Sequence, residues 1–281
     1  MQYHGDLYSG TAGLDKRRSV AYPLLIGFKL SDILTIMKTE YFTAHMPSQT
    51  LATTIQRDVA LAIEDVLGSL PKSEQLSVDE RRGIIARYTA VLEGNFIYWM
   101  TGAYLSVASE KARLIILGNL REEVRDSHPR MLRQFATAAN AIPTDLDAIA
   151  VDRDLTEVRL FLGRLAGVPI VIMMAFFEGV IQNFMSYLAE LAAAQGSHEY
   201  EYTDVHGVCD VAHTKELYEA LAAEMALHPP EPATNIFEGA DLLRTLMKTI
   251  IEPSCRSKEI QPISFAARST VSPVGLSSFA G

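Results

Sequence analysis

The sequence predicts an all-α protein, a bundle of about seven or eight helices, on three observations. Apolar residues recur at helical spacing along most of the chain, no segment alternates apolar and polar residues as a strand does, and proline and glycine clusters punctuate the helical segments. At 281 residues, of which 48% are hydrophobic and 21% charged, the chain can bury a large core. We expect one helical-bundle domain over residues 1–252 and an extended or disordered tail over 253–281.

Each helix is expected between two such breaks in the pattern. A capping box, Ser77 with Glu80 three residues later, marks one start, and Gly196 follows the end of the most apolar helix. Prolines at 229, 230 and 232 separate the last two helices. The expected helices span residues 22–45, 49–67, 78–108, 110–127, 144–163, 169–195, 203–227 and 234–250.

Composition excludes several classes of protein. A net charge of −9 argues against a nucleic-acid binder, which needs a basic face. Cys209 and Cys255 have no CxxC partner, so we expect no disulfide framework and a reducing, cytoplasmic location. The most apolar run, residues 165–177, is too short to cross a bilayer at about 13 residues, and the start lacks a secretory signal, so we expect no membrane partner.

The segment His206-Gly-Val-Cys-Asp210-Val-Ala-His213 places three potential metal ligands on one face of a helix. At about 100° per residue, the spacings of four and three bring both imidazoles beside Asp210. Two imidazoles and a carboxylate suit iron, manganese or zinc. The alternative is a surface helix on which two of seven histidines happen to be in phase. Cys209 is expected to point about 100° away from its neighbours, and we assign it no nucleophilic role.

A second candidate ligand is Glu178, which stands in the apolar sequence Ala-Phe-Phe-Glu178-Gly-Val. An ionised carboxylate is costly to bury there without a partner. A metal ion is one such partner, and an arginine or protonation of the carboxyl group are the others.

A third candidate region runs from Asn119 to Pro129, where several carboxylates precede His128 in a helical context. On a straight helix, a spacing of five leaves His128 about 140° from Glu123, and a spacing of six leaves it about 120° from Glu122. Neither pair converges on such a helix. Pro129 disfavours the α conformation at His128, which offers an end or a kink in the helix at that point.

Together these motifs resemble the haem-oxygenase-like diiron oxidases, a superfamily that includes undecene-forming fatty-acid decarboxylases, lysine-fragmenting oxidases and N-oxygenases. The resemblance covers residues 95–248, about half of the chain. It implies a haem-oxygenase-like helical bundle that binds two Fe(II) ions and uses O2 as cosubstrate. The implied metal ligands are Glu123, His128, Glu178, His206, Asp210 and His213.

The choice of Glu123 over Glu122 rests on the resemblance, because Glu123 stands four residues after Asn119 as in the family motif. Glu122 and Asp126 are kept as reserve ligands or as groups that support the ligands. Glu93 is a further internal carboxylate in reserve, for which a solvated helix position is the alternative.

The function implied by the resemblance is a non-haem diiron oxygenase or oxidase of specialised metabolism. It would N-oxygenate or oxidatively cleave a small amine or amino-acid-like substrate. An oxidative decarboxylase or desaturase of a fatty acid is the alternative and needs a long apolar tunnel with a cationic end. Two functions outside this class remain open as alternatives: a metal-free helical binding protein, and a thiaminase-like hydrolase with a cysteine nucleophile. The expected partners are a small-molecule substrate, a second copy of the chain in a homodimer and, as an option, an external electron donor. The sequence does not decide between an Fe/Fe and an Mn/Fe centre.

Overall fold

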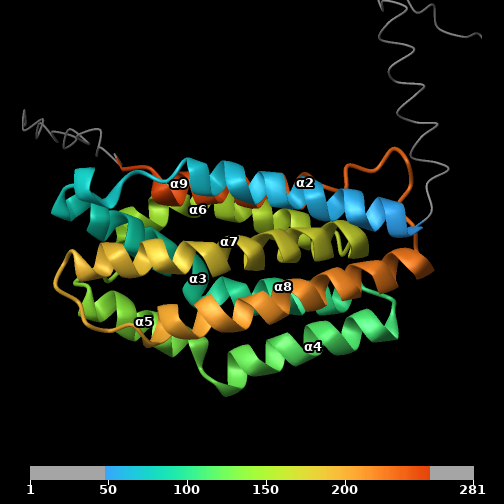
Figure 1. Ribbon diagram of the computed structural model, residues 1–281, viewed down its shortest axis with the longest axis horizontal. Coiled ribbons are helices and arrows are strands. Elements are labelled where there is room, and N and C mark those ends of the chain that lie inside the picture. The colour runs from blue at the N-terminus through green and yellow to red at the C-terminus, as the bar shows by residue number, and fades with distance from the viewer. Residues whose placement is uncertain (1–47, 254–281) are drawn as a thin grey trace, which may run out of the picture. The chain divides into compact units, whose positions relative to one another are not determined.

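The structure is a computed structural model that describes residues 48–253. Within that range the chain forms eight α-helices and one short 3₁₀ helix, η1, and it contains no strand, so the all-α prediction is confirmed. The helices are arranged as a bundle (Figure 1). Their bounds are α2 Ser48–Gly68, η1 Ser73–Gln75, α3 Val78–Ser106, α4 Glu110–Arg125, α5 His128–Ala138, α6 Asp145–Leu162, α7 Gly167–Ala193, α8 Glu201–Leu227 and α9 Glu238–Ile251.

Most expected helices are present, with ends shifted by a few residues. Ser77 and Glu80 form the expected capping box at the start of α3. Two expectations were wrong: α5 was not foreseen, and the last helix begins at Glu238 rather than at residue 234. The expected helix at 22–45 and residues 254–281 of the expected tail lie outside the described residues, so the extent of the domain stays a prediction.

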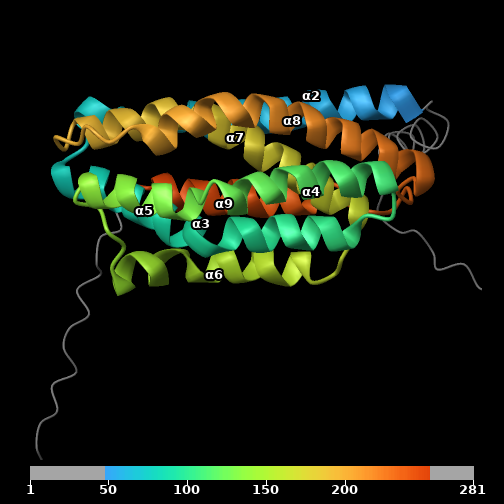
Figure 2. The same cartoon turned by 90° about the horizontal axis from the view of Figure 1, so that it is seen from below.

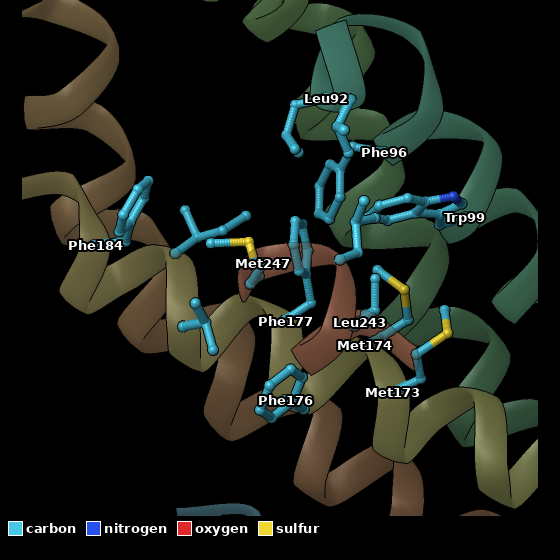
Figure 3. Packing of buried hydrophobic residues seen from close by; sticks show 14 of the residues in the cluster. Leu92, Phe96, Trp99, Met173, Met174, Phe176, Phe177, Phe184, Leu243 and Met247 are labelled. Carbon is cyan, nitrogen blue, oxygen red and sulfur yellow. The ribbon is translucent and has the colours of Figure 1, made fainter. Parts of the chain in front are cut away.

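Helix α7 lies at the centre of the bundle (Figures 1 and 2) and packs against α2, α3, α8 and α9. Its side chains form much of the buried apolar cluster shown in Figure 3, together with residues of α3 and α9. The Phe177 ring meets Trp99 edge-on, with 5.1 Å between ring centroids, and lies 5.8 Å from Phe96. The residue after Phe177 is Glu178, so this carboxylate is carried into the interior by one of the most apolar helices of the chain.

Among the described helices, α7 is also the one that is long and apolar enough to cross a membrane. The other helices of the bundle bury most of it, which is typical of the core helix of a soluble protein. The cytoplasmic location expected from the sequence stays a prediction.

Helix α4 runs antiparallel to α8 and is tied to it at one end by a buried carboxylate. Glu224 of α8 accepts hydrogen bonds from the backbone N–H groups of Ala108 and Ser109, at 3.0 and 2.8 Å. These donors precede the first turn of α4, where the helix itself supplies no acceptor. The tie fixes α4 along α8, so that Glu122 and Glu123 near its other end lie beside the histidines of α8.

Candidate metal centre

Helix α8 presents three of the predicted ligands on one buried face, as their spacing requires. His206, Asp210 and His213 are each no more than 4% exposed. Nδ1 of His206 lies 3.3 Å from Oδ1 of Asp210, and Nδ1 of His213 lies 3.7 Å from the same oxygen. The prediction that the three side chains share one volume is therefore met by the geometry, while metal binding itself stays a prediction.

Helix α7 contributes Glu178, which is 1% exposed and faces α8. Its Oε1 lies 3.9 Å from Nδ1 of His213. Burial raises the pKa of Glu178 well above its usual range, and the nearby carboxylates of Asp210 and Glu123 raise it further. A carboxyl group in such a position remains ionised at neutral pH only if a cation joins it.

The junction between α4 and α5 explains how Glu123 and His128 converge despite their spacing. α4 ends at Arg125, and Ser127 adopts the left-handed conformation with φ of 57°. His128 then begins α5, with Pro129 in the first turn, where a missing N–H costs nothing. The turn brings His128 Nδ1 to 2.8 Å from Glu123 Oε1. The helix thus ends two residues before the expected end at 127, and the turn that follows lets the two side chains meet.

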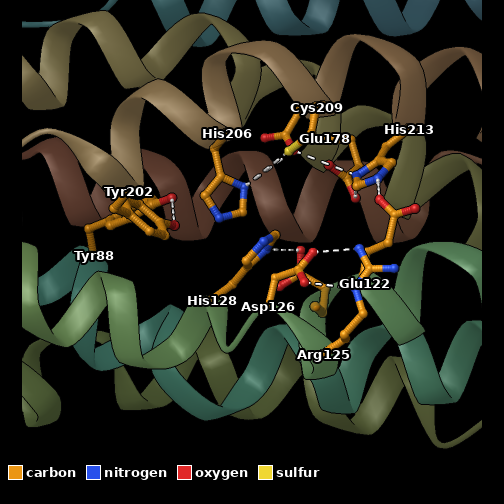
Figure 4. A network of polar contacts seen from close by, with 12 residues as sticks. Tyr88, Glu122, Arg125, Asp126, His128, Glu178, Tyr202, His206, Cys209 and His213 are labelled. Atoms are coloured by element: carbon orange, nitrogen blue, oxygen red, sulfur yellow. Dashed lines mark hydrogen bonds and ion pairs between the residues drawn. The ribbon is translucent and has the colours of Figure 1, made fainter.

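Six buried side chains therefore form two neighbouring groups of potential ligands. The junction triad consists of Glu123, His128 and His206, and the helix triad consists of Glu178, Asp210 and His213. Within each triad, one ligand atom from each residue lies within 4.8 Å of the other two. The two triads are adjacent, because Nδ1 of His206 in the junction triad lies 3.3 Å from Oδ1 of Asp210 in the helix triad. Within the junction triad, the His128 and His206 rings meet edge-on with 4.5 Å between their centroids (Figure 4).

Buried polar atoms without a partner show that these residues fit a metal. Among residues 48–253, four ligand atoms of the cluster are buried without a hydrogen-bond partner, namely Glu178 Oε1, His206 Nε2, Asp210 Oδ2 and His213 Nδ1. Each such atom costs about 1–3 kcal/mol when nothing binds it. A cation bound by these lone pairs would remove that cost. The imidazole and carboxylate donors of the two triads suit iron, manganese or zinc. The Cys209 thiol lies beside His206 and Asp210 as a further potential ligand.

In the metal-free protein, contacts between carboxylates and histidines of the cluster shift their pKa values in opposite directions. Burial by itself would raise the pKa of Asp210, but its contacts with His206 and His213 outweigh burial and lower that pKa. Burial would lower the pKa of His213, but the nearby carboxylates of Asp210, at 3.7 Å, and Glu122, at 3.0 Å, outweigh burial and raise it to about 9. Without a metal, His213 is therefore an imidazolium that neutralises the nearby carboxylate at neutral pH.

In the junction triad, burial and a neighbouring carboxylate likewise have opposite effects on the pKa of His128. Burial disfavours its charged form, but the hydrogen bond and the charge of Glu123 outweigh burial and raise the pKa of His128. Protons thus take the place of metal ions in both triads of the metal-free protein. Metal binding requires that they leave.

Of the reserve ligands, Glu122 comes near the cluster but on its outer side. Its Oε2 lies 3.0 Å from Nε2 of His213, and its side chain is 45% exposed. Glu123, by contrast, is 3% exposed and lies within the junction triad. Of these two carboxylates, Glu123 is the one buried among the candidate ligands, and which of the two binds metal stays a prediction.

The other two reserve carboxylates form ion pairs with arginines outside the two triads. Asp126 accepts hydrogen bonds from its neighbour Arg125 at the surface, with donor–acceptor distances of 2.7 and 2.6 Å. Glu93 pairs with Arg133. Neither belongs to a triad.

Sequence reasoning missed the contact that Cys209 makes. The Sγ atom donates to Oδ1 of Asp210 at 3.2 Å, so the expectation that this side chain points away was wrong. A χ1 rotation suffices to bring a side chain toward its neighbour, which a count of angles along the helix does not include. Burial and the Asp210 carboxylate raise the pKa of the Cys209 thiol, so the thiol stays protonated and is a donor rather than a nucleophile.

Two buried tyrosines next to the junction triad were also missed. Tyr202 lies one turn before His206 on α8, with 4.5 Å between their ring centroids, and its hydroxyl group lies 2.9 Å from that of Tyr88. Burial raises the pKa of both phenols, so both are neutral. The position of Tyr202 four residues before His206 was the signal available in the sequence.

A small cavity of about 20 Å³ adjoins the junction triad and also reaches Glu178. A single water-sized molecule needs about 10–15 Å³. Besides the ligands and Tyr202, the described residues that line it are apolar: Leu92, Phe96, Ile97, Pro129, Leu132 and Ile181. The cavity thus offers a small, mostly apolar space beside the candidate ligands.

Comparison with known proteins gives one match. A protein family described as "Iron-containing redox enzyme" matches residues 85–246, which is more than half of the chain and includes all six residues of the two triads. No curated protein and no solved structure matches the chain significantly.

Proposed function

The chain belongs to the family of iron-containing redox enzymes, and we propose that it is an O2-dependent, non-haem diiron oxidoreductase. The observation that carries the proposal is the set of four buried ligand atoms without a partner in the two adjacent triads. One iron per triad would satisfy them. A metal-free binding protein would leave these atoms unsatisfied, and a hydrolase would require a reactive thiol, which the protonated Cys209 does not supply.

In this proposal the junction triad holds one iron and the helix triad the other. Glu178 is placed to serve both, because it belongs to the helix triad and also lines the cavity next to the junction triad. Two Fe(II) ions supply two electrons to O2 when they are bound. The chain contributes rigid ligand positions on α7 and α8, and it excludes bulk water through the apolar walls around the cavity.

For the substrate, the sequence resemblance supports a small amine or amino-acid-like molecule that is N-oxygenated or oxidatively cleaved. One structural observation supports a second candidate, an aliphatic chain such as that of a fatty acid. Apolar residues form most of the described walls of the cavity beside the ligands, although its volume of about 20 Å³ and a lining without lysine or arginine fall short of the long tunnel with a cationic end that a fatty acid requires. Such walls favour an apolar group next to the metals over a charged one.

A single experiment tests the chemistry and separates the two substrate classes. The purified chain is loaded with Fe(II) without oxygen and mixed with O2 in a stopped-flow spectrometer, with and without panels of amino acids, amines and fatty acids. The proposal predicts bound iron, a transient visible absorption and faster O2 consumption with one of the panels. Absence of bound iron and of any absorption change would refute it.

Two accompanying expectations follow the resemblance. A homodimer is proposed, to be measured by light scattering. An external electron donor is proposed for repeated turnover wherever the substrate itself does not supply the electrons that O2 reduction requires.

A further inference from the structure

We infer that Glu122 is a positioning residue that holds His213 by its outer nitrogen and so selects Nδ1 as the metal-binding atom of this histidine. The inference rests on the proposed metal centre and goes beyond it, because it assigns a role to a residue outside both triads. Figure 4 shows the arrangement: Glu122 reaches from α4 toward the His213 ring on α8.

The two nitrogens of His213 have different surroundings. Nε2 lies 3.0 Å from Oε2 of Glu122. Nδ1 is buried without a hydrogen-bond partner among the described residues, and it lies 3.7 Å from Asp210 and 3.9 Å from Glu178. One side of the ring therefore faces a carboxylate at the edge of the cluster, and the other faces the two carboxylates of its own triad.

The chemistry of imidazole turns this asymmetry into a choice of metal-binding atom. A neutral ring carries one N–H, and the partner of that N–H decides which nitrogen keeps its lone pair. A carboxylate acceptor at Nε2 holds the proton there and leaves the lone pair of Nδ1 for the metal. Such an outer carboxylate also raises the basicity of the histidine and fixes the plane of its ring.

Because Glu122 and Glu123 are adjacent on α4, the contact between Glu122 and His213 links α4 to both triads. The next residue, Glu123, enters the junction triad, while Glu122 contacts the helix triad through His213. Adjacent residues of one helix thus reach both triads. Since Glu224 ties the start of α4 to α8, the distance from Glu122 to His213 is set by the packing of these two helices.

The competing role for Glu122 is direct metal ligation. Its side chain is 45% exposed, whereas every side chain of the two triads is at most 5% exposed. It also contacts the nitrogen of His213 that is directed away from Asp210 and Glu178. Both observations favour support of the histidine over ligation.

The first test measures metal binding by the variants Glu122→Ala and Glu122→Gln, with Asp126→Asn as the matched control. Asp126 is a carboxylate near the same end of α4 that pairs only with Arg125 in the described hydrogen bonds. We expect Glu122→Ala to bind the same number of metal ions as the wild type, with about 10–100-fold lower affinity for one of them. Glu122→Gln keeps an acceptor oxygen and should lose less. Asp126→Asn, which removes a charge that acts on His128 of the junction triad, should leave the affinity of the helix triad as in the wild type. Loss of a metal ion from the stoichiometry in Glu122→Ala would make Glu122 a ligand and overturn the inference.

The second test observes the histidine ring directly. In the zinc-loaded protein labelled with ¹⁵N in its histidine rings, the signals of His213 are identified by their loss in His213→Asn. We expect a slowly exchanging proton on Nε2 and a metal-shifted Nδ1, and we expect that proton to exchange faster in Glu122→Ala. Zinc on Nε2 would overturn this role alone, whereas failure of the wild type to bind any metal would refute the proposed function as well.

Discussion

The two triads are built from different kinds of backbone. The helix triad takes its residues from the uninterrupted helices α7 and α8, where fixed rise and rotation set the positions of Glu178, Asp210 and His213. The junction triad depends on a break between α4 and α5, at which the left-handed Ser127 turns His128 toward Glu123. The helix triad therefore needs only the packing of two regular helices, whereas the junction triad also requires the turn at Ser127.

The variant with the largest expected effect removes the carboxylate that we place between the triads. Glu178→Gln keeps the shape of the side chain but removes its charge, so we expect the affinity for iron to fall by more than about 100-fold in both triads. The metal-free variant should be at least as stable as the metal-free wild type, because burial already disfavours the charged form of Glu178. Anaerobic iron titration and thermal unfolding measure the two properties. Full iron binding by this variant would contradict the shared role of Glu178.

The dependence of the Tm on pH tests the helix triad, because it reports the protonation of His213 in the metal-free protein. In the metal-free protein the pKa of His213 is raised from 6.5 to about 9. The resulting stabilisation is fully present below pH 6.5 and is lost as the pH rises through 9. We expect the Tm of the metal-free protein to fall by about 4 °C or more across this window, at roughly 2–4 °C for each kcal/mol.

His213→Gln, also metal-free, is the control for this measurement and should lose most of that slope. The zinc-loaded wild type should lose it as well, because its imidazole is already neutral and metal-bound. A Tm of the metal-free wild type that is flat or rises between pH 6.5 and 9 would show that His213 is not held as an imidazolium.

A substitution at Ser127 breaks the junction triad selectively. Ser127→Val places a β-branched residue at a φ of 57°, which we expect to cost about 1–2 kcal/mol of folding free energy. His128 should then separate from Glu123, and one of the two metal ions should be lost while the helix triad keeps the other. Ser127→Gly, which tolerates this φ, is the control and should retain both. Equal metal content and stability in the two variants would show that the turn does not position His128.

The smallest expected effect concerns the thiol beside Asp210. Cys209→Ala removes the hydrogen bond to Oδ1, worth about 0.5–1.5 kcal/mol, so we expect a loss of roughly 3–10-fold in metal affinity. Cys209→Ser keeps a donor and should lose less. Equal affinities in the wild type and both variants, measured by isothermal titration, would show that the thiol does not support Asp210.

Much of the part of the site that α7 and α8 supply could be predicted from the sequence. Spacings of four and three place His206, Asp210 and His213 on one face of any regular helix, and the apolar neighbours of Glu178 indicate that it is buried. Both inferences use only local geometry and the cost of burying charge. The family match agrees with the class of protein that they indicated.

The junction triad could be predicted only in part. The order of residues suggested Glu123 and His128, but a straight helix would have kept them apart. Pro129 was interpreted as a stop signal, although proline is equally at home in the first turn of a helix, and α5 was missed for that reason. The left-handed conformation of Ser127 and the rotamer of Cys209 depend on packing between helices, which no local pattern encodes.

The number of metal ions that each chain binds tests the central claim most directly. The metal-free protein is titrated anaerobically with Fe(II), bound iron is measured by elemental analysis, and Mössbauer spectra are recorded before and after exposure to O2. The two triads predict two irons per chain, in two distinct ferrous sites that O2 oxidises together. A single iron per chain, or none, or two irons that O2 oxidises independently, would contradict the account.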